Sequence, residues 1–174
     1  MTMFVPDLMA DLVPSKSAAG FNLGGHFDII QKEIGSVEWY EKDAKLSEKL
    51  ASNSGWIGVV SKCGIPGGSY TAVRSLIYMD NVVCLEFEEN LRLYRVYVGN
   101  GYVGNFIGVR PGDRLLSLEK DFDILFNDMD DEFLLVKDGK ILEGICFLTD
   151  YRAPLENAPE QTIQFISIHD WFLR

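Results

Sequence analysis

The chain has 174 residues, of which 47% are hydrophobic and 12% aromatic. This composition is enough for a buried core and excludes an intrinsically disordered chain. Sixteen Lys and Arg stand against 26 Asp and Glu, which gives a formal net charge of −10. That charge disfavours binding to nucleic acid or to anionic membranes and favours a basic partner. The length predicts a single domain over residues 1–174.

The N-terminal segment, residues 1–17, contains two prolines and two aspartates where a signal peptide would be apolar. No stretch approaches the length of a membrane span. The three cysteines are far apart, and Cys84 and Cys146 lie in strand-like runs. Cys84 and Cys146 are therefore expected as buried thiols in a reducing compartment, which predicts a cytoplasmic protein. The alternative is a secreted protein with one disulfide and a spare thiol.

Two stretches, residues 20–40 and 108–128, follow the same pattern of a glycine-containing turn, a short amphipathic helix and a strand. Their apolar stripes match in the pairs Phe27 and Leu115, Ile30 and Leu118, and Ile34 and Phe122. The spacing places each stripe on one helical face. One explanation of the match is that the chain consists of two related halves, and the other is that a common pattern recurs by chance.

From Gly55 onward the sequence is dominated by strand-like segments: residues 56–60, 75–79, 82–88, 91–98, 132–137, 141–148 and 162–168. Asp80-Asn81 and Asp138-Gly139 are hairpin turns in this interpretation. Loops are expected at residues 63–69 and 150–161, and a loop or a short surface helix at 41–54. The predicted fold is α+β, a mainly antiparallel, meandering β-sheet with a few short helices packed on one face.

Alternation within residues 82–88 predicts one core face and one wet face for that strand. The core positions are Val83, Leu85 and Phe87, and the wet positions are Cys84, Glu86 and Glu88. Arg92 and Arg95, on the next strand, are expected to pair across the strands with Glu86 or Glu88.

The segment Gly99–Gly104, GNGYVG, satisfies the pattern G-x-G-x-x-G. A dinucleotide site requires a helix directly after the glycines, whereas residues 105–107 read as another strand. The lysine, H-R-D and D-F-G motifs of a kinase are missing. The segment is therefore interpreted as a turn at Asn100-Gly101.

The chain has two histidines, His26 and His169. His26 heads the first predicted helix. His169 precedes Asp170, and neighbours on a strand point to opposite faces, which disfavours a relay. Ser167 and Cys146 are candidate nucleophiles, but the sequence identifies no base beside either. Together with the lack of C-x-x-C, H-E-x-x-H and H-x-H spacings, this predicts no catalytic residue, no cofactor and no metal site.

Seven acidic residues fall between Glu119 and Glu132, against the single Lys120. The ligand spacing of a calcium loop is missing from this run. One interpretation is a solvated loop, and the other is an anionic docking surface with Phe126 and Met129 as apolar contacts. In the second interpretation the partner-binding residues are Asp123, Asp128, Asp130, Asp131 and Glu132.

The turn and helix of residues 20–34 and 108–122 resemble the repeat unit of β-lactamase-inhibitor-type domains and of small outer-membrane assembly lipoproteins. Those families are exported, often with disulfides or a lipid anchor, and this sequence shows neither feature. The whole profile, a small acidic α+β domain with many aromatics and no catalytic set, resembles bacterial immunity proteins of toxin–immunity pairs, such as those of contact-dependent growth inhibition. That resemblance implies a protein that blocks the active site of a toxin, in many cases a basic nuclease.

The sequence therefore predicts a non-catalytic binding protein, an immunity protein that neutralises a cognate toxin domain through an acidic surface. Two alternatives stay open. One is a small-molecule or peptide-binding domain with Trp39, Trp56 and Tyr97 lining a pocket. The other is an enzyme of unfamiliar type.

Overall fold

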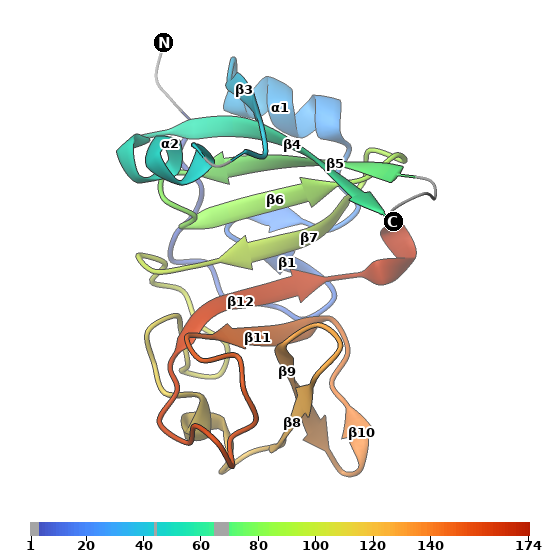
Figure 1. The fold of residues 1–174 in the computed structure, drawn as a ribbon. Coiled ribbons are helices and arrows are strands. Elements are labelled where there is room, and N and C mark those ends of the chain that lie inside the picture. Colours follow the sequence, from blue (N-terminus) through green and yellow to red (C-terminus); the bar gives the residue numbers. More distant parts are fainter. Residues whose placement is uncertain (1–3, 44, 65–69) are drawn as a thin grey trace.

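The computed structural model describes residues 4–43, 45–64 and 70–174, and these form one large, mainly antiparallel sheet with few helices (Figure 1). The strands are β1 (Ser17–Ala18), β2 (Phe21–Asn22), β3 (Glu38–Glu41), β4 (Trp56–Gly64), β5 (Tyr70–Tyr78), β6 (Val83–Phe87), β7 (Leu93–Val98), β8 (Asp123–Asn127), β9 (Glu132–Lys137), β10 (Lys140–Ile141), β11 (Ile145–Thr149) and β12 (Ile163–His169). The helices are α1 (Phe27–Ile34), α2 (Leu46–Ser52) and the 3-10 helices η1 (Leu115–Leu118) and η2 (Trp171–Leu173). The predicted mainly-β α+β class is confirmed.

Strands β3 to β7 are neighbours in chain order, and only the β3–β4 pair among the described strands is parallel. β12 then joins β7 to β11, although β7 and β12 are far apart in the sequence. β9 pairs with β8 along one edge and with β10 and β11 along the other. The arm predicted at residues 141–148 is thus broken at residues 142–144, where Gly144 adopts a φ of 79°.

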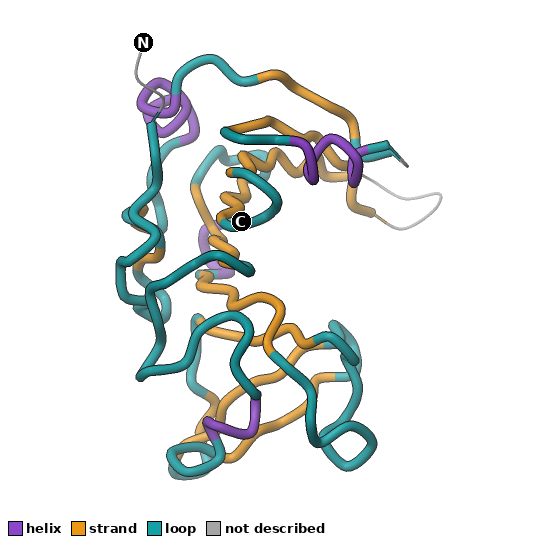
Figure 2. Tube along the Cα trace, turned by 90° about the vertical axis from the view of Figure 1, so that its left-hand side faces the viewer, coloured by secondary structure: helices purple, strands orange, loops and turns teal. Residues whose placement is uncertain are grey.

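Seen edge-on, the sheet bends so that its two ends project toward the same side (Figure 2). We name the two sides the core face and the cleft face. On the core face, α1, the N-terminal arm and the loops around η1 bury the largest apolar cluster, which includes Phe27, Leu85 and Leu115. Because most of the buried apolar side chains belong to this cluster, it accounts for most of the hydrophobic stabilisation.

The two α-helices lie on opposite sides of the sheet, so the prediction that the helices pack on one face is wrong. Ile34 of α1 belongs to the large cluster on the core face. Leu50 of α2 packs with Ile57 and Val59 of β4 in a second cluster on the cleft face. The reason is that β4 is apolar at successive positions, so it offers apolar surface to both sides.

Buried polar groups hold the N-terminal arm against the core. The Tyr102 hydroxyl donates to the Ala10 carbonyl at 2.7 Å and accepts from the Ala19 amide at 3.0 Å. Burial raises the pKa of Tyr102 to about 12. The Trp56 indole donates to the Phe4 carbonyl at 2.9 Å. Because these side chains supply partners to irregular backbone, the arm is packed without joining the large sheet.

The two repeated units share local conformation but not sheet position. All four matched glycines have positive φ, at 85° and 84° for Gly20 and Gly24 and at 86° and 95° for Gly108 and Gly112. The first unit, however, has an α-helix and a parallel strand, and the second a 3-10 helix and an antiparallel strand. The origin of the chain from two related halves stays a prediction.

Two loop predictions have different outcomes. The predicted turn at Asn100-Gly101 is present, with the Tyr102 amide bonded to the Gly99 carbonyl at 3.1 Å. The strand predicted at residues 105–107 is wrong, because Phe106 forms only an isolated bridge to Val109. In the loop predicted at residues 63–69, Cys63 and Gly64 belong to β4, and residues 65–69 lie outside the described part of the chain.

Gly104 lies so close to the arm that an added Cβ would collide with the carbonyl of Ala10. We expect Gly104→Ala to lower the free energy of unfolding by about 3 kcal/mol. The matched control is Gly139→Ala, where φ is 73° and no atom lies within 4 Å of the added Cβ; it costs about 1 kcal/mol. Urea unfolding measures both, and equal losses would contradict this packing of the arm.

Candidate functional site: a cleft on the curved sheet

The cleft face carries a cavity of about 940 Å³ between the two projecting ends of the sheet. Its charged lining is mostly acidic. The acids are Glu86, Glu88, Asp130, Glu132, Glu143 and Asp170, and the bases are Lys42, Arg95 and Arg174. η2 lies inside the bend, where the C-terminal end of the chain is marked in Figure 2. The cleft is therefore a concave, mixed polar and aromatic surface, which is typical of binding sites.

Strand pairing brings residues from distant parts of the chain into two rows across the cleft face. One row runs through Ser75, Glu86, Arg95 and His169. The next runs through Ile77, Cys84, Tyr97, Ser167 and Cys146. Residues directly opposite each other on paired strands share a face, so these rows form one continuous surface.

A bulge in the β6–β7 pair sets the centre of this surface. Glu86 pairs with Arg95 and Phe87 with Leu93, which leaves Tyr94 as the extra residue of β7. A bulge re-aims side chains next to it. Here both Tyr94 and Arg95 reach the carboxylate of Glu86.

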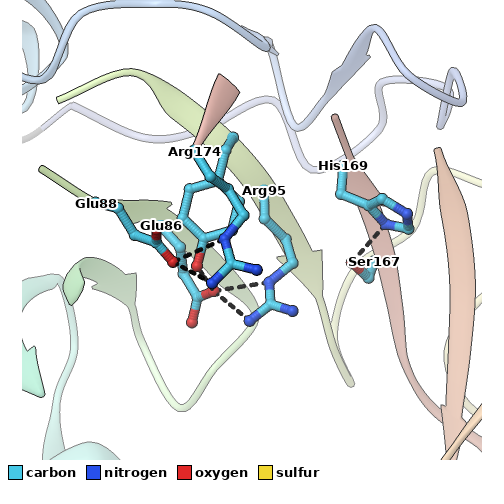
Figure 3. Close-up of polar contacts among 7 residues, drawn as sticks. Glu86, Glu88, Arg95, Ser167, His169 and Arg174 are labelled. Carbon is cyan, nitrogen blue, oxygen red and sulfur yellow. Dashed lines mark hydrogen bonds and ion pairs between the residues drawn. The ribbon is translucent and has the colours of Figure 1, made fainter. Parts of the chain in front are cut away.

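Glu86 is the acceptor for three donors from the bulge (Figure 3). Arg95 Nε and Nη2 lie 2.7 and 2.5 Å from its Oε2, and the Tyr94 hydroxyl donates to the same oxygen at 3.1 Å. Burial opposes the charge of Arg95, but the Glu86 carboxylate together with Tyr97 and Tyr94 more than offsets burial, so the pKa of Arg95 is raised. Burial, and then Glu86, also raise the pKa of Tyr94. The pair is therefore charged and fixed, with Tyr94 neutral.

A second ion pair lies beside the first. Arg174 Nε and Nη2 lie 2.9 and 2.6 Å from Glu88 Oε1 (Figure 3). The guanidinium lies 5.5 Å from the ring centres of both Tyr94 and Trp171. The hydrogen bond to Glu88 raises the pKa of Arg174. Asp170 positions η2 by accepting from the Phe172 amide at 3.0 Å. Two arginines are thus held between carboxylates and aromatic rings.

His169 and Ser167 lie together on β12, with Ser167 Oγ 3.3 Å from His169 Nδ1. Burial, and then Arg95, lower the pKa of His169 to about 4, and its ring stacks on Trp171 at 4.4 Å between centres. Ser167 has no exposed surface, so its hydroxyl is not presented to a ligand. Cys146, also buried, has a raised pKa because of burial and of Glu132, which makes it a poor nucleophile. The arrangement supports a structural role for the three side chains.

The structure separates the five predicted partner-binding acids into two groups. Asp123 begins β8 opposite Val136, whereas the other four lie at or beside the β8–β9 turn at the far end of the same strand. The rise of a strand puts about 13 Å between the two ends of β8. Of the five, Asp130 and Glu132 line the cleft. No Lys or Arg in the described ranges lies within 4.0 Å of any of the five carboxylates.

The apolar residues predicted to accompany this surface also differ from one another. Met129, in the turn, is 89% exposed and available for contact. Phe126 packs against Phe133 at 5.0 Å between ring centres, so it contributes to the core. Only Met129 of the two is placed as a partner contact requires.

The aromatic pocket predicted from Trp39, Trp56 and Tyr97 is not formed. Trp56 is buried in the core-face cluster, and Trp39 lies against Phe27 of that cluster. Tyr97 is on the opposite, cleft face. Tyr94 and Trp171 line the cleft together with Tyr97. The sequence did not predict their positions, because a bulge in β7 and the helix η2 place them there.

The structure also tests the predictions for Arg92, Arg95 and His26. Arg95 pairs with Glu86 as expected, but Arg92 donates to the Gly24 carbonyl at 3.0 Å. His26 caps α1, with Nδ1 accepting from the Asp28 amide at 3.3 Å. No cluster of three or more potential metal ligands occurs in the described residues.

Comparison with protein-family models, curated proteins and solved structures found no match. Within the described chain no helix has the length and apolarity to cross a bilayer.

Glu86→Leu would leave Arg95 charged and mostly buried with no counter-ion. We expect it to lower the free energy of unfolding by about 3 kcal/mol, since breaking a buried pair costs more than replacing it. The double variant Glu86→Leu/Arg95→Met should recover most of this loss in urea unfolding. A double variant no more stable than Glu86→Leu would show that the pair does not organise the cleft.

The pKa of about 4 for His169 lies below its ordinary value of 6.5, so the folded state favours the neutral ring. Its contribution to stability is complete above pH 6.5 and is lost as the pH falls toward 4, because the unfolded chain takes up the proton first. We expect wild type to lose about 3 kcal/mol more than His169→Phe over this range. Urea unfolding at several pH values measures the difference, and parallel pH profiles would contradict it.

Proposed function

We propose that this protein is a non-catalytic binding protein of the immunity type, which neutralises a cognate toxin domain by covering it. One observation carries the proposal: acids without a cationic partner in the described chain occupy the rim of a preformed cleft. Asp128, Asp130 and Asp131 are exposed at the β8–β9 turn, and Glu132 continues the same surface into the cavity.

Electrostatics make such a surface suited to a basic protein. Carboxylates without a cationic partner attract cations at long range and accelerate association, above all at low salt. The neighbouring apolar side chains Met129 and Phe172 are 89% and 96% exposed and would contribute contact area. A basic nuclease domain would be recognised by both properties together.

Under this proposal the protein acts in the cytoplasm, where its toxin would otherwise do damage. The buried, unpaired thiols of Cys84 and Cys146 support a reducing compartment. No cofactor or metal takes part, and inhibition is by occlusion.

The cleft also supports a second candidate, a small-molecule or peptide-binding domain. A cavity of about 940 Å³ with aromatic walls has the size of a ligand site. Thermal unfolding with a metabolite library distinguishes the two, because a specific ligand raises the unfolding temperature. A stabilising metabolite, with no binding to any toxin domain, would favour this second candidate.

We expect a neighbouring gene to encode a toxin domain, and co-expression of this chain with that domain tests the proposal. We expect growth to be rescued by this chain and a stoichiometric complex to be isolated. Continued killing, with no complex formed between the two purified proteins, would contradict the proposal.

The site is tested by replacing Asp123, Asp128, Asp130, Asp131 and Glu132 with Lys. We expect the association rate at low salt to fall by at least about tenfold and its salt dependence to weaken. The matched control replaces five exposed acids elsewhere, Asp11, Glu33, Glu48, Asp80 and Glu156. Equal effects of the two variants would show that association depends on the overall net charge and not on this site.

A further inference from the structure

The two residues of the Arg174–Glu88 ion pair differ in solvent exposure. The side chain of Glu88 is 9% exposed, whereas that of Arg174 is 50% exposed. Glu88 is thus a fixed, nearly buried acceptor, and the guanidinium that satisfies it comes from the solvent side. Because Arg174 is half exposed, solvent reaches the contact from its side, and another cation can take its place on Glu88.

The walls around this guanidinium are held by contacts that do not involve Arg174. The Tyr94 hydroxyl is fixed by its hydrogen bond to Glu86. Trp171 stacks on His169 and lies 5.2 Å from the Arg95 guanidinium. The backbone of η2 is tied down separately, because the Asp170 amide donates to the Tyr94 carbonyl at 2.8 Å and the Asn90 side chain bonds to the Leu173 carbonyl. A site of this shape persists when the Arg174 side chain leaves.

We propose that Glu88, Tyr94 and Trp171 form an arginine-binding site for the partner, and that Arg174 occupies it until an arginine of the partner takes its place. This inference rests on the proposed function and specifies the partner: its binding surface presents an arginine to the cleft. Glu132 and Asp130 line the same cavity, and no described Lys or Arg lies within 4.0 Å of either carboxylate, so they would attract further cations of the partner.

The chemistry of the site selects arginine over lysine. A guanidinium is planar and presents several N–H donors in a fixed fork, and here two of them, from Nε and Nη2, reach one carboxylate oxygen. The same plane can lie against the aromatic rings on both sides. A lysine ammonium has no face to stack and a larger hydration cost, so it fits this site less well.

The test needs no toxin and uses the full chain with N-acetyl-arginine amide as the probe. The amides of lysine and of citrulline, which has the shape of arginine without its charge, are the comparison ligands. Binding is followed by the indole N–H resonance of Trp171 and by its fluorescence. The variants are Arg174→Met, Arg174→Met/Glu88→Gln, and the control Arg110→Met, which removes an exposed arginine outside the cleft.

We expect the arginine amide to bind Arg174→Met about fivefold more tightly than wild type, as it would if Arg174 holds the site about four fifths of the time. Arg110→Met should behave as wild type, and Glu88→Gln should remove the binding. The lysine and citrulline amides should bind more weakly by a similar factor or more. Because Arg174 is half exposed, its replacement should leave the fold intact, which urea unfolding verifies.

Two results would overturn the inference. One is a Trp171 signal in Arg174→Met that the arginine amide does not shift, and the other is equal binding of the arginine and lysine amides. Either could occur while the toxin is still neutralised, in which case the proposed function stands without an arginine site. Conversely, arginine binding without toxin binding would leave the site intact and refute the immunity function.

Discussion

The ion pair between Glu86 and Arg95 is the interaction on which the cleft depends. The two charges lie on the same face of the sheet as an apolar cluster that includes Ile57, Val59 and Ile77. Since each charge is mostly buried, neither is tolerable without the other. The bulge at Tyr94 brings the donors to Glu86, and the polar surface of the cleft continues outward from that centre.

The two faces of the sheet differ in composition: the core face is apolar, and the cleft face is largely polar and charged. The core face buries Phe87, Phe133 and Phe147 completely and provides stability. The cleft face keeps neutral His169 beside charged Arg95, with Ser167 and Cys146 buried in the next row. These buried polar groups lie beneath the acidic, concave surface between the ends of the bent sheet.

The sequence was informative where one interaction dominates locally. Alternation assigned Leu85 to the core, and strand adjacency predicted the pairing of Arg95 with Glu86. It could not predict that β12 inserts beside β7, because that pairing joins distant segments, and so the meeting of His169 with Arg95 was hidden. Nor could it predict a bulge, the bend of the sheet, or the return of Arg174 into the cleft. The acidic run was evident from its charges, but the sequence could not show that β8 places Asp123 away from the other four acids.

Under the proposed function, the cleft face, and not the core face, receives the partner. Hydrogen exchange of the chain free and bound to its cognate toxin domain tests this most directly. We expect slower exchange at residues 86–97, 127–132 and 167–174 in the complex. Protection confined to α1 and to residues 99–122, with the cleft exchanging as in the free protein, would contradict it.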